Sequence, residues 1–153
     1  MVGNLFKIHK PRVYHAHEVK ETPDGIPYVV RSKFNNGIKC RVSKNLDIVA
    51  SPGGVISFGS ENASFFYQTE EWCSGRDIYY IDTRSIPQES CLFVTACLQT
   101  ITGKYSYNNG LFPELLKKET IKLPISENGE PNWSYMQDYI LHIQRFISFS
   151  PLY

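Results

Sequence analysis

Two polar segments of this sequence carry side chains that could read a nucleic acid. The first, residues 31–41, combines Asn35 and Asn36 with several lysines and arginines. Asn can form two hydrogen bonds to adenine, and Arg or Lys suits guanine in the major groove. The second, residues 102–110, follows a stretch of helical periodicity and again combines aromatic and amide side chains. Asn-Gly turns are abundant in all proteins, so each segment alone also fits an ordinary surface turn.

The positive charge of the chain is concentrated in its first third. The net charge is only +1, yet residues 1–50 carry nine Lys and Arg against four Asp and Glu, while residues 51–153 carry seven against eleven. No acid occurs between residues 31 and 44, where five cations lie: Arg31, Lys33, Lys39, Arg41 and Lys44. Such a cluster can contact phosphates. It equally fits a solvated strand-and-turn surface, because nucleic-acid-binding domains are usually more basic overall.

Catalytic and metal chemistry have little support in the sequence. His15 and His17 flank Ala16, with His9 nearby, but zinc needs a third and usually a fourth ligand, and neither H-E-x-x-H nor a close Cys pair is present. Both G-x-x-x-x-G-K-[ST] and G-x-G-x-x-G are absent, so residues 52–54 are not a phosphate loop. A Cys/His nucleophile pair would assemble in space rather than in sequence, so it leaves no signal here. We expect no catalysis, no cofactor and no metal.

The cysteine content indicates a reducing compartment. The four cysteines (Cys40, Cys73, Cys91 and Cys97) form no C-x-x-C pair and are too few for a disulfide scaffold. The longest apolar stretch, residues 91–98, is far shorter than the ~20 residues that span a bilayer. No secretory signal is visible at the N-terminus. We expect reduced, mostly buried thiols in a cytoplasmic protein.

The first two-thirds of the chain predicts short strands separated by turns. A turn at residues 23–25 precedes a strand over residues 26–30, and the turn at residues 35–37 precedes a strand over residues 38–42. Further runs of aromatic and β-branched residues predict strands over residues 47–50, 55–58, 64–68 and 77–82.

The hydrophobic period changes after Pro87, which suits a helix entrance. Residues 88–101 predict a buried helix, residues 112–118 a short helix and residues 121–125 a strand. Asn132 can cap a last helix, whose apolar residues follow at spacings of 3 and 4 and which Pro151 keeps from continuing far. This order predicts an α+β fold: one globular domain of short mixed or antiparallel strands, a few helices and a C-terminal helix.

Four blocks of the sequence, in order, carry a resemblance to a known family. They are residues 2–8 ("G-x-L-F-x-I"), residues 25–29 with 35–38 ("G-x-I-P-y-I … N-N-G-I"), residues 54–59 with 66–68 ("G-x-I-x-x-g … Y-Q"), and residues 121–125 with 129–136 ("I-x-L-P … G-x-P-D-W-x-y-M"). Together they resemble one target recognition domain of the specificity (S) subunits of type I restriction–modification systems. The resemblance is in particular to the BcgI-like group found in type IIB enzymes.

The resemblance also implies a domain organisation. Asn132 stands where the family usually has Asp, and both residues cap helices. A full S subunit is similar to two such domains joined by long antiparallel helices, whereas here the last helix is expected to end near Ser148. Residues 1–153 therefore resemble a single target recognition domain, half of an S subunit with a truncated spacer helix. A truncated gene, a standalone half-subunit and an excised domain all fit.

The function implied by the resemblance is sequence-specific binding of double-stranded DNA at one half-site. The domain would have no catalysis of its own. Methylation and cleavage would belong to its partners, the modification (methyltransferase) subunits and a restriction subunit. From their chemistry we expect phosphate contacts from four cations, Lys33, Lys39, Arg41 and Lys104. We expect base-edge contacts from Ser32, Asn35, Asn36, Tyr105 and Tyr107, with Arg31 and Arg76 as further DNA-binding candidates.

Two other functions fit the same sequence. The chain could be a protein-interaction module, a decoy or regulatory half-subunit that docks on methyltransferase subunits through the exposed face of its last helix. A Cys- or metal-dependent enzyme is a third reading, which metal analysis of the purified protein would test.

The charge cluster generates a prediction about salt. Affinity for random duplexes should fall steeply as salt rises, with a log–log slope of about −0.9 for each phosphate neutralised, because bound cations release condensed counterions. Fluorescence anisotropy at two salt concentrations measures the slope. A flat response would remove the phosphate-binding role of the cluster.

Overall fold

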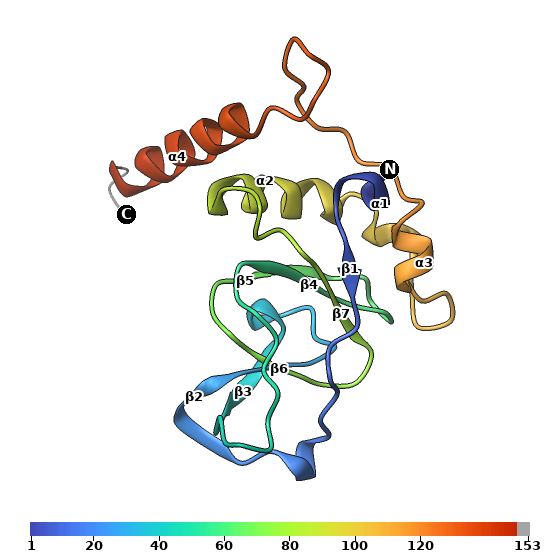
Figure 1. Cartoon of the computed structure of the whole chain (residues 1–153), viewed down its shortest axis with the longest axis vertical. Coiled ribbons are helices and arrows are strands. Elements are labelled where there is room, and N and C mark those ends of the chain that lie inside the picture. The colour runs from blue at the N-terminus through green and yellow to red at the C-terminus, as the bar shows by residue number, and fades with distance from the viewer. Residues whose placement is uncertain (150–153) are drawn as a thin grey trace.

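The computed structural model describes residues 1–149 and has two small β-sheets beneath a layer of helices (Figure 1). One sheet has the strand order β1 (Ile8–His9), β7 (Ile78–Ile81), β4 (Val55–Gly59), β5 (Phe65–Gln68). The other has the order β3 (Ile38–Val42), β2 (Glu21–Val29), β6 (Cys73–Ser74). All strand pairs are antiparallel except β2 with β6. The predicted α+β class is confirmed, while the predicted stop at Pro151 lies outside the described residues.

The main core lies between the four-stranded sheet and helix α2 (Gln88–Gln99), which lies above strands β4 and β5 in Figure 1. Strand β4 is buried along its whole length, as expected of a central strand. Ile56 and Phe58 of β4 pack in one cluster with Val94 and Leu98 of α2. The core therefore fixes the helix on one sheet face and leaves the edge strands β1 and β5 at the periphery.

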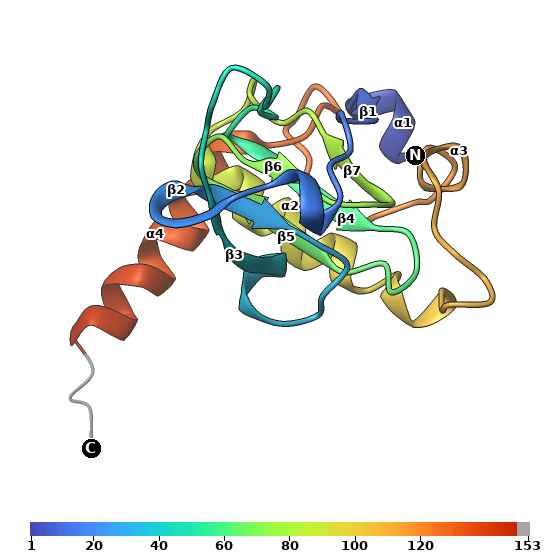
Figure 2. The same cartoon turned by 90° about the horizontal axis from the view of Figure 1, so that it is seen from below.

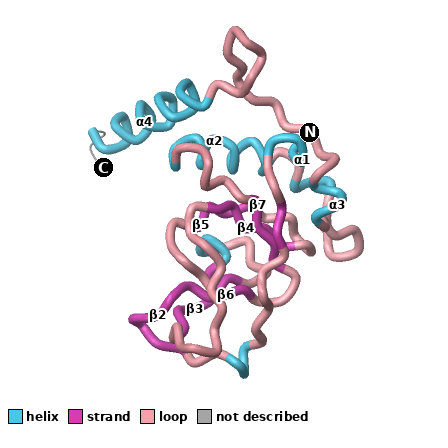
Figure 3. The backbone as a smooth tube through the Cα atoms, viewed as in Figure 1, coloured by secondary structure: helices cyan, strands magenta, loops and turns pink. Residues whose placement is uncertain are grey.

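Two short helices close the core beside the N-terminus. They are α1 (Val2–Leu5) and α3 (Pro113–Leu116), joined by backbone hydrogen bonds from Val2 to Glu119 and from Gly3 to Lys117. Neither α1 nor strands β1 and β6 were predicted, because two to four residues are too few to show a hydrophobic period. Figure 3 shows how much of the remaining chain consists of loops between these elements.

The C-terminal helix α4 (Trp133–Phe149) begins at the predicted cap. The backbone N–H of Tyr135 donates to Asn132 Oδ1 at 2.9 Å, the N-cap bond that the sequence indicated. Met136 is fully buried against the core, and Ser90 of α2 donates to the Trp133 carbonyl at 2.8 Å. These contacts hold the start of α4 on the core, and the rest of the helix extends away from the other elements (Figure 2). No helix within residues 1–149 is both long and apolar enough to cross a membrane.

The strands predicted over residues 47–50 and 121–125 are wrong, because groups outside a β-ladder form the hydrogen bonds or packing contacts of these segments. Over residues 47–50 the Tyr14 hydroxyl donates to the Asp47 carbonyl and accepts from the Val49 N–H, so no neighbouring strand is needed. Residues 121–125 pack Ile121 and Leu123 on the core without a ladder, and the carbonyl of Pro124 accepts from Asn132 instead.

The predicted turn at residues 23–25 is also wrong. These residues lie inside β2, where Glu21 and Ile26 both align with Val42, so the residues between them form a large bulge. Gly25 permits it, because a Cβ there would lie 2.0 Å from the Val42 carbonyl oxygen. The remaining predicted strands and helices are confirmed within a few residues of their predicted ends.

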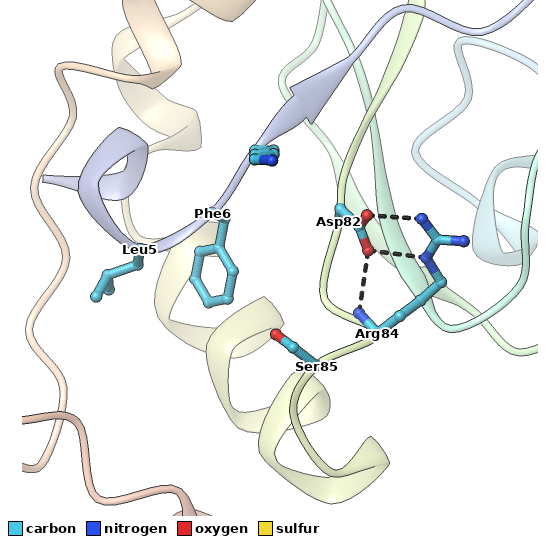
Figure 4. Close-up of a pocket in the computed structure, with 6 residues that line it drawn as sticks. Leu5, Phe6, Asp82, Arg84 and Ser85 are labelled. Carbon is cyan, nitrogen blue, oxygen red and sulfur yellow. Dashed lines mark hydrogen bonds and ion pairs between the residues drawn. The ribbon is translucent and has the colours of Figure 1, made fainter.

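An ion pair closes the turn after β7, beside a hollow of about 560 Å³ at the β1 edge of the sheet (Figure 4). Arg84 donates to the Asp82 carboxylate from Nε at 2.9 Å and from its terminal nitrogen at 2.7 Å. These hydrogen bonds, which outweigh the opposing effect of burial, lower the pKa of Asp82 to about 2.

The Asp82–Arg84 pair predicts an acid-dependent contribution to stability. Because the folded-state pKa of Asp82 is depressed, the contribution is complete above the ordinary value of 3.8 and disappears as the pH falls toward about 2. The difference in urea midpoint between the parent and Arg84→Gln should therefore shrink across this pH range. Arg145→Gln, at an exposed position on α4, is the control and should show no such trend. A midpoint difference that stays constant with pH would contradict the assignment.

Candidate nucleic-acid interface

The two polar segments singled out in the sequence meet at one hollow of about 340 Å³. Lys33 contributes from the first segment and Thr102, Gly103 and Tyr105 from the second, with Asn62, Ser64 and Gln99 between them. Figure 2 shows the loop after β2 and the chain after α2 on the same side of the molecule. The hollow lies at the β5 edge of the sheet, because Ser64 precedes β5 and Gln99 donates to the carbonyl of Phe65 at 2.6 Å.

The loop between β2 and β3 has a rare backbone conformation. Its three-residue turn η2 (Asn35–Gly37) has positive φ at every position: 49°, 54° and 75°. Residues other than glycine seldom adopt this region, and Asn is among the most tolerant of it. Position 37 also has little space for a side chain, because a Cβ there would lie 3.2 Å from the ring of Phe66.

Side-chain amides hold this strained turn in place. Asn35 Nδ2 donates to the carbonyl of Ile38 at 2.8 Å, and Asn36 Nδ2 donates to the carbonyl of Tyr67 at 3.0 Å. Gln68, which is 2% exposed, donates from Nε2 to the Asn36 carbonyl and to Ser57 Oγ, both at 3.0 Å. The loop is thus bonded to strand β5, which Gln68 links to Ser57 of β4, and the hydrogen bonds offset the cost of the loop's backbone.

Three candidate base readers have structural bonds of their own. The amide nitrogens of Asn35 and Asn36 are used in the turn, and Ser32 Oγ accepts from the N–H of Phe34 at 3.1 Å. All three are positioning residues of the loop. Their contact with bases stays a prediction.

Acids from later in the chain pair with most of the cation cluster. Arg31 contacts Glu61, and it also contacts Asp77 at 3.5 Å. Asp77 pairs with Arg76 as well, at 3.2 Å.

The other two paired cations of the cluster are Arg41 and Lys44. Arg41 donates to both carboxylate oxygens of Glu70 and to the Gly25 carbonyl. Lys44 pairs with Glu71. The positive charge of residues 31–44 is therefore largely neutralised by carboxylates that the fold brings beside it.

Lys33 and Lys39 are exposed and have no ion pair within residues 1–149. They differ in position. Lys33 lines the hollow between the two polar segments, whereas Lys39 lines a separate hollow beside the turn η1 (Ala16–Glu18). Of the two, Lys33 is the cation that the fold places beside the second polar segment.

The second segment is a short turn followed by a tight hairpin. Turn η3 (Thr102–Lys104) leads to Ser106 and Asn109, which exchange two backbone hydrogen bonds at 3.0 and 3.1 Å. Tyr107 lies at the hairpin tip and is 78% exposed. Asn109 Nδ2 donates to the Lys104 carbonyl at 3.0 Å and so holds the tip against the turn.

Glu119 fixes the base of this segment. Its carboxylate accepts from the Tyr105 hydroxyl at 2.5 Å and from Lys104 Nζ at 2.8 Å. Burial alone would raise the pKa of Glu119, but these hydrogen bonds outweigh it and lower the pKa. Burial and the bond to Glu119 raise the pKa of Tyr105 to about 12. Tyr105 and Lys104 are thus tied to an acid that no sequence motif indicated.

The structure adds residues that the sequence analysis missed. Asn62 and Ser64 come from the β4–β5 turn, a position that flanking predicted strands could have flagged. Phe34 lies within the first polar segment and is 79% exposed. A lone Phe in a polar segment carries no sequence signal for nucleic-acid contact, because Phe more often lies in the core.

The geometry disfavours the alternative chemistries. Burial raises the pKa of all four thiols, to about 11 for Cys73, whereas a nucleophilic cysteine needs a lowered pKa. His15 and His17 stack on each other at 5.8 Å, and residues 1–149 contain no group of three His, Cys, Asp or Glu able to hold a metal. All four cysteines are free thiols, as predicted.

Comparisons with known proteins point in one direction. A family model described as the type I restriction modification DNA specificity domain matches residues 1–146. The specificity subunit S.BcgI of a type II restriction enzyme from Heyndrickxia coagulans is 24% identical over 145 residues, covering 94% of this chain and 42% of that subunit.

Two solved structures share the fold. The S subunit of a type I restriction–modification system from M. genitalium superposes with a TM-score of 0.65 at 13% identity, covering 96% of this chain and 38% of that one. The HsdS subunit from Thermoanaerobacter tengcongensis gives 0.62 at 13% identity, with 96% and 37% coverage. The chain thus spans less than half the length of the proteins it matches.

The buried amide of Gln68 generates a stability prediction. Gln68→Ala should lower the free energy of unfolding by about 1–3 kcal/mol, because it leaves groups on Asn36 and Ser57 without their partner. Amide exchange at Gly37 should accelerate at the same time. Gln144→Ala, at an exposed position on α4, should change neither quantity. Equal behaviour of the two variants in urea unfolding and hydrogen exchange would show that Gln68 does not hold the loop.

Proposed function

This chain belongs to the family of type I restriction modification DNA specificity domains, and we propose that it binds double-stranded DNA and reads one half-site of a longer target. The observation that carries the proposal is the meeting of the two polar segments at one hollow, with the ammonium of Lys33, which has no ion pair among residues 1–149, on its wall. A domain that reads bases needs loops held rigidly on a scaffold, and both segments are fixed by side-chain bonds to the body of the protein.

We assign phosphate contact first to Lys33. It is exposed and has no carboxylate partner within residues 1–149, so its charge is available to an anion. Lys39 would contribute only to a duplex that also reaches the η1 side. The ion pairs of Arg31, Arg41, Arg76 and Lys104 give these cations a smaller share, since binding a phosphate would compete with an acid already present.

We assign base reading to polar groups that project from the rigid loops. Tyr107 at its hairpin tip is 78% exposed, and Asn62 of the β4–β5 turn lines the hollow, where its Oδ1 accepts from the Ser64 N–H at 3.3 Å. The Nδ2 group of Asn62 can donate to an acceptor on a base edge, and a tyrosine hydroxyl donates or accepts there. Asn35, Asn36, Ser32 and Tyr105 support these contacts by holding the loops.

On this proposal the domain has no catalysis of its own and acts as one recognition domain of a specificity subunit. Methyltransferase subunits, with a restriction subunit as a further partner, would supply the chemistry in the cytoplasm. The sequence likeness to S.BcgI, a specificity subunit of a restriction enzyme, supports the proposal. A single half-site reader should bind weakly, because linking two such domains raises the effective concentration of the second.

A second function, docking on methyltransferase subunits, is favoured by helix α4. Its Tyr135, Tyr139 and Ile147 are about half exposed or more, and α4 contributes nothing to the hollow. The two functions use different surfaces. A pull-down against methyltransferase subunits alongside a duplex-binding assay separates them.

The proposal predicts a specific effect of Lys33. Lys33→Ala should weaken binding to every duplex by a similar factor and reduce the salt slope by about 1, because a phosphate contact carries no sequence information. Lys10→Ala is the matched control: Lys10 is exposed and follows β1, at the sheet edge opposite β5. Anisotropy titrations with duplexes selected from a random pool, and with unselected duplexes, measure both effects. If the two variants behave alike, Lys33 is not at the interface; if selection enriches no sequence, the half-site function fails.

A further inference from the structure

Phe34 is a large apolar side chain on an otherwise polar loop. It is 79% exposed and lies between Lys33, which lines the hollow, and the strained turn at residues 35–37. Single exposed apolar residues are common on protein surfaces, and Phe34 differs in having a hydrogen-bonded backbone next to Lys33 of the hollow wall.

The backbone of Phe34 is held on both sides. Its N–H donates to Ser32 Oγ at 3.1 Å, and its carbonyl accepts from the Gly37 N–H at 2.9 Å and from Ser32 Oγ at 3.3 Å. The turn that follows is bonded to strand β5 through Asn36. The ring is therefore carried on a rigid support instead of a mobile loop.

The loop that carries Phe34 is otherwise polar along the chain. Its sequence neighbours are Ser32, Lys33, Asn35 and Asn36, which are polar or charged. Protein interfaces need a contiguous apolar centre of several residues. A base step needs one apolar side chain on a stiff backbone, with cations beside it for the flanking phosphates. The loop matches the second requirement.

We propose that Phe34 is a wedge: its ring inserts partly between two adjacent base pairs of the bound duplex, unstacks them and kinks the duplex away from the inserted ring. This inference rests on the proposed function and adds how the duplex is deformed at the site. Insertion buries the ring against base faces, and Lys33, the preceding residue in the chain, contacts a phosphate that flanks the opened step. Sequence preference then arises at the wedged step, because pyrimidine–purine steps unstack most easily.

The test compares Phe34→Ala and Phe34→Trp with Leu46→Ala, a control at a fully exposed apolar residue outside the loop. All use the full chain and a duplex selected from a random pool, with 2-aminopurine placed at each position in turn and a dye at each end. The parent should raise 2-aminopurine fluorescence at one step and shorten the end-to-end distance. Phe34→Ala should abolish both signals and lose about tenfold or more in affinity. Phe34→Trp and Leu46→Ala should keep both signals.

The other outcomes overturn the inference in distinguishable ways. If Phe34→Ala binds, unstacks and bends the duplex like the parent, the wedge is wrong while the proposed function stands. If Phe34→Ala leaves duplex binding intact but weakens capture of methyltransferase subunits, the ring contacts protein. If the parent and Leu46→Ala bind no duplex, the proposed function fails and the wedge fails with it. Because Phe34 is exposed, thermal unfolding of the variants should match the parent and so excludes misfolding.

Discussion

Gln68 lies at the end of strand β5 with its amide enclosed between the sheet and the β2–β3 loop. It donates to Ser57 on one side and to the Asn36 carbonyl on the other. A buried amide of this kind is costly unless it is bonded, and once bonded it permits few alternative arrangements. The loop carrying Lys33 and Phe34 depends on it, because the three left-handed residues that follow would otherwise relax to commoner conformations.

The same logic applies to the second loop, where the partly buried Glu119 is the anchoring group. One carboxylate holds both a tyrosine hydroxyl and a lysine ammonium, and the hairpin with Tyr107 at its tip stands on that base. Each loop is thus fixed by one polar side chain anchored in the body of the protein. Such anchoring lets residues at loop tips vary without disturbing the scaffold, which on the proposed function would allow different target sequences to be read.

This surface offers little unpaired positive charge, because most of its cations pair with carboxylates of the same chain. Three of the five clustered cations face carboxylates of residues 61–77. Exposed ion pairs add little stability, but they reduce the charge offered to a phosphate backbone. A weakly charged reader gains little from non-specific binding, so on the proposed function its selectivity depends on shape, deformation of the duplex and linkage to a second domain.

The sequence alone determined the elements with local causes. Runs of aromatic and β-branched residues defined β4, β5 and β7, the Asn-Gly turn defined the start of β3, and Asn132 defined the start of α4, since residue type, turn chemistry and capping act over a few residues. The sequence also identified the two polar segments.

Only the tertiary structure decided which cations form ion pairs and which amides are hydrogen-bonded. The partners are far apart in the sequence: Arg41 and Glu70 are separated by 29 residues, and Asn36 and Tyr67 by 31. Strands 47–50 and 121–125 failed for the same reason, because a tyrosine hydroxyl and core packing supplied from elsewhere in the chain replaced the expected ladder. Long-range pairing depends on chain topology, which the residue pattern within a single segment does not contain.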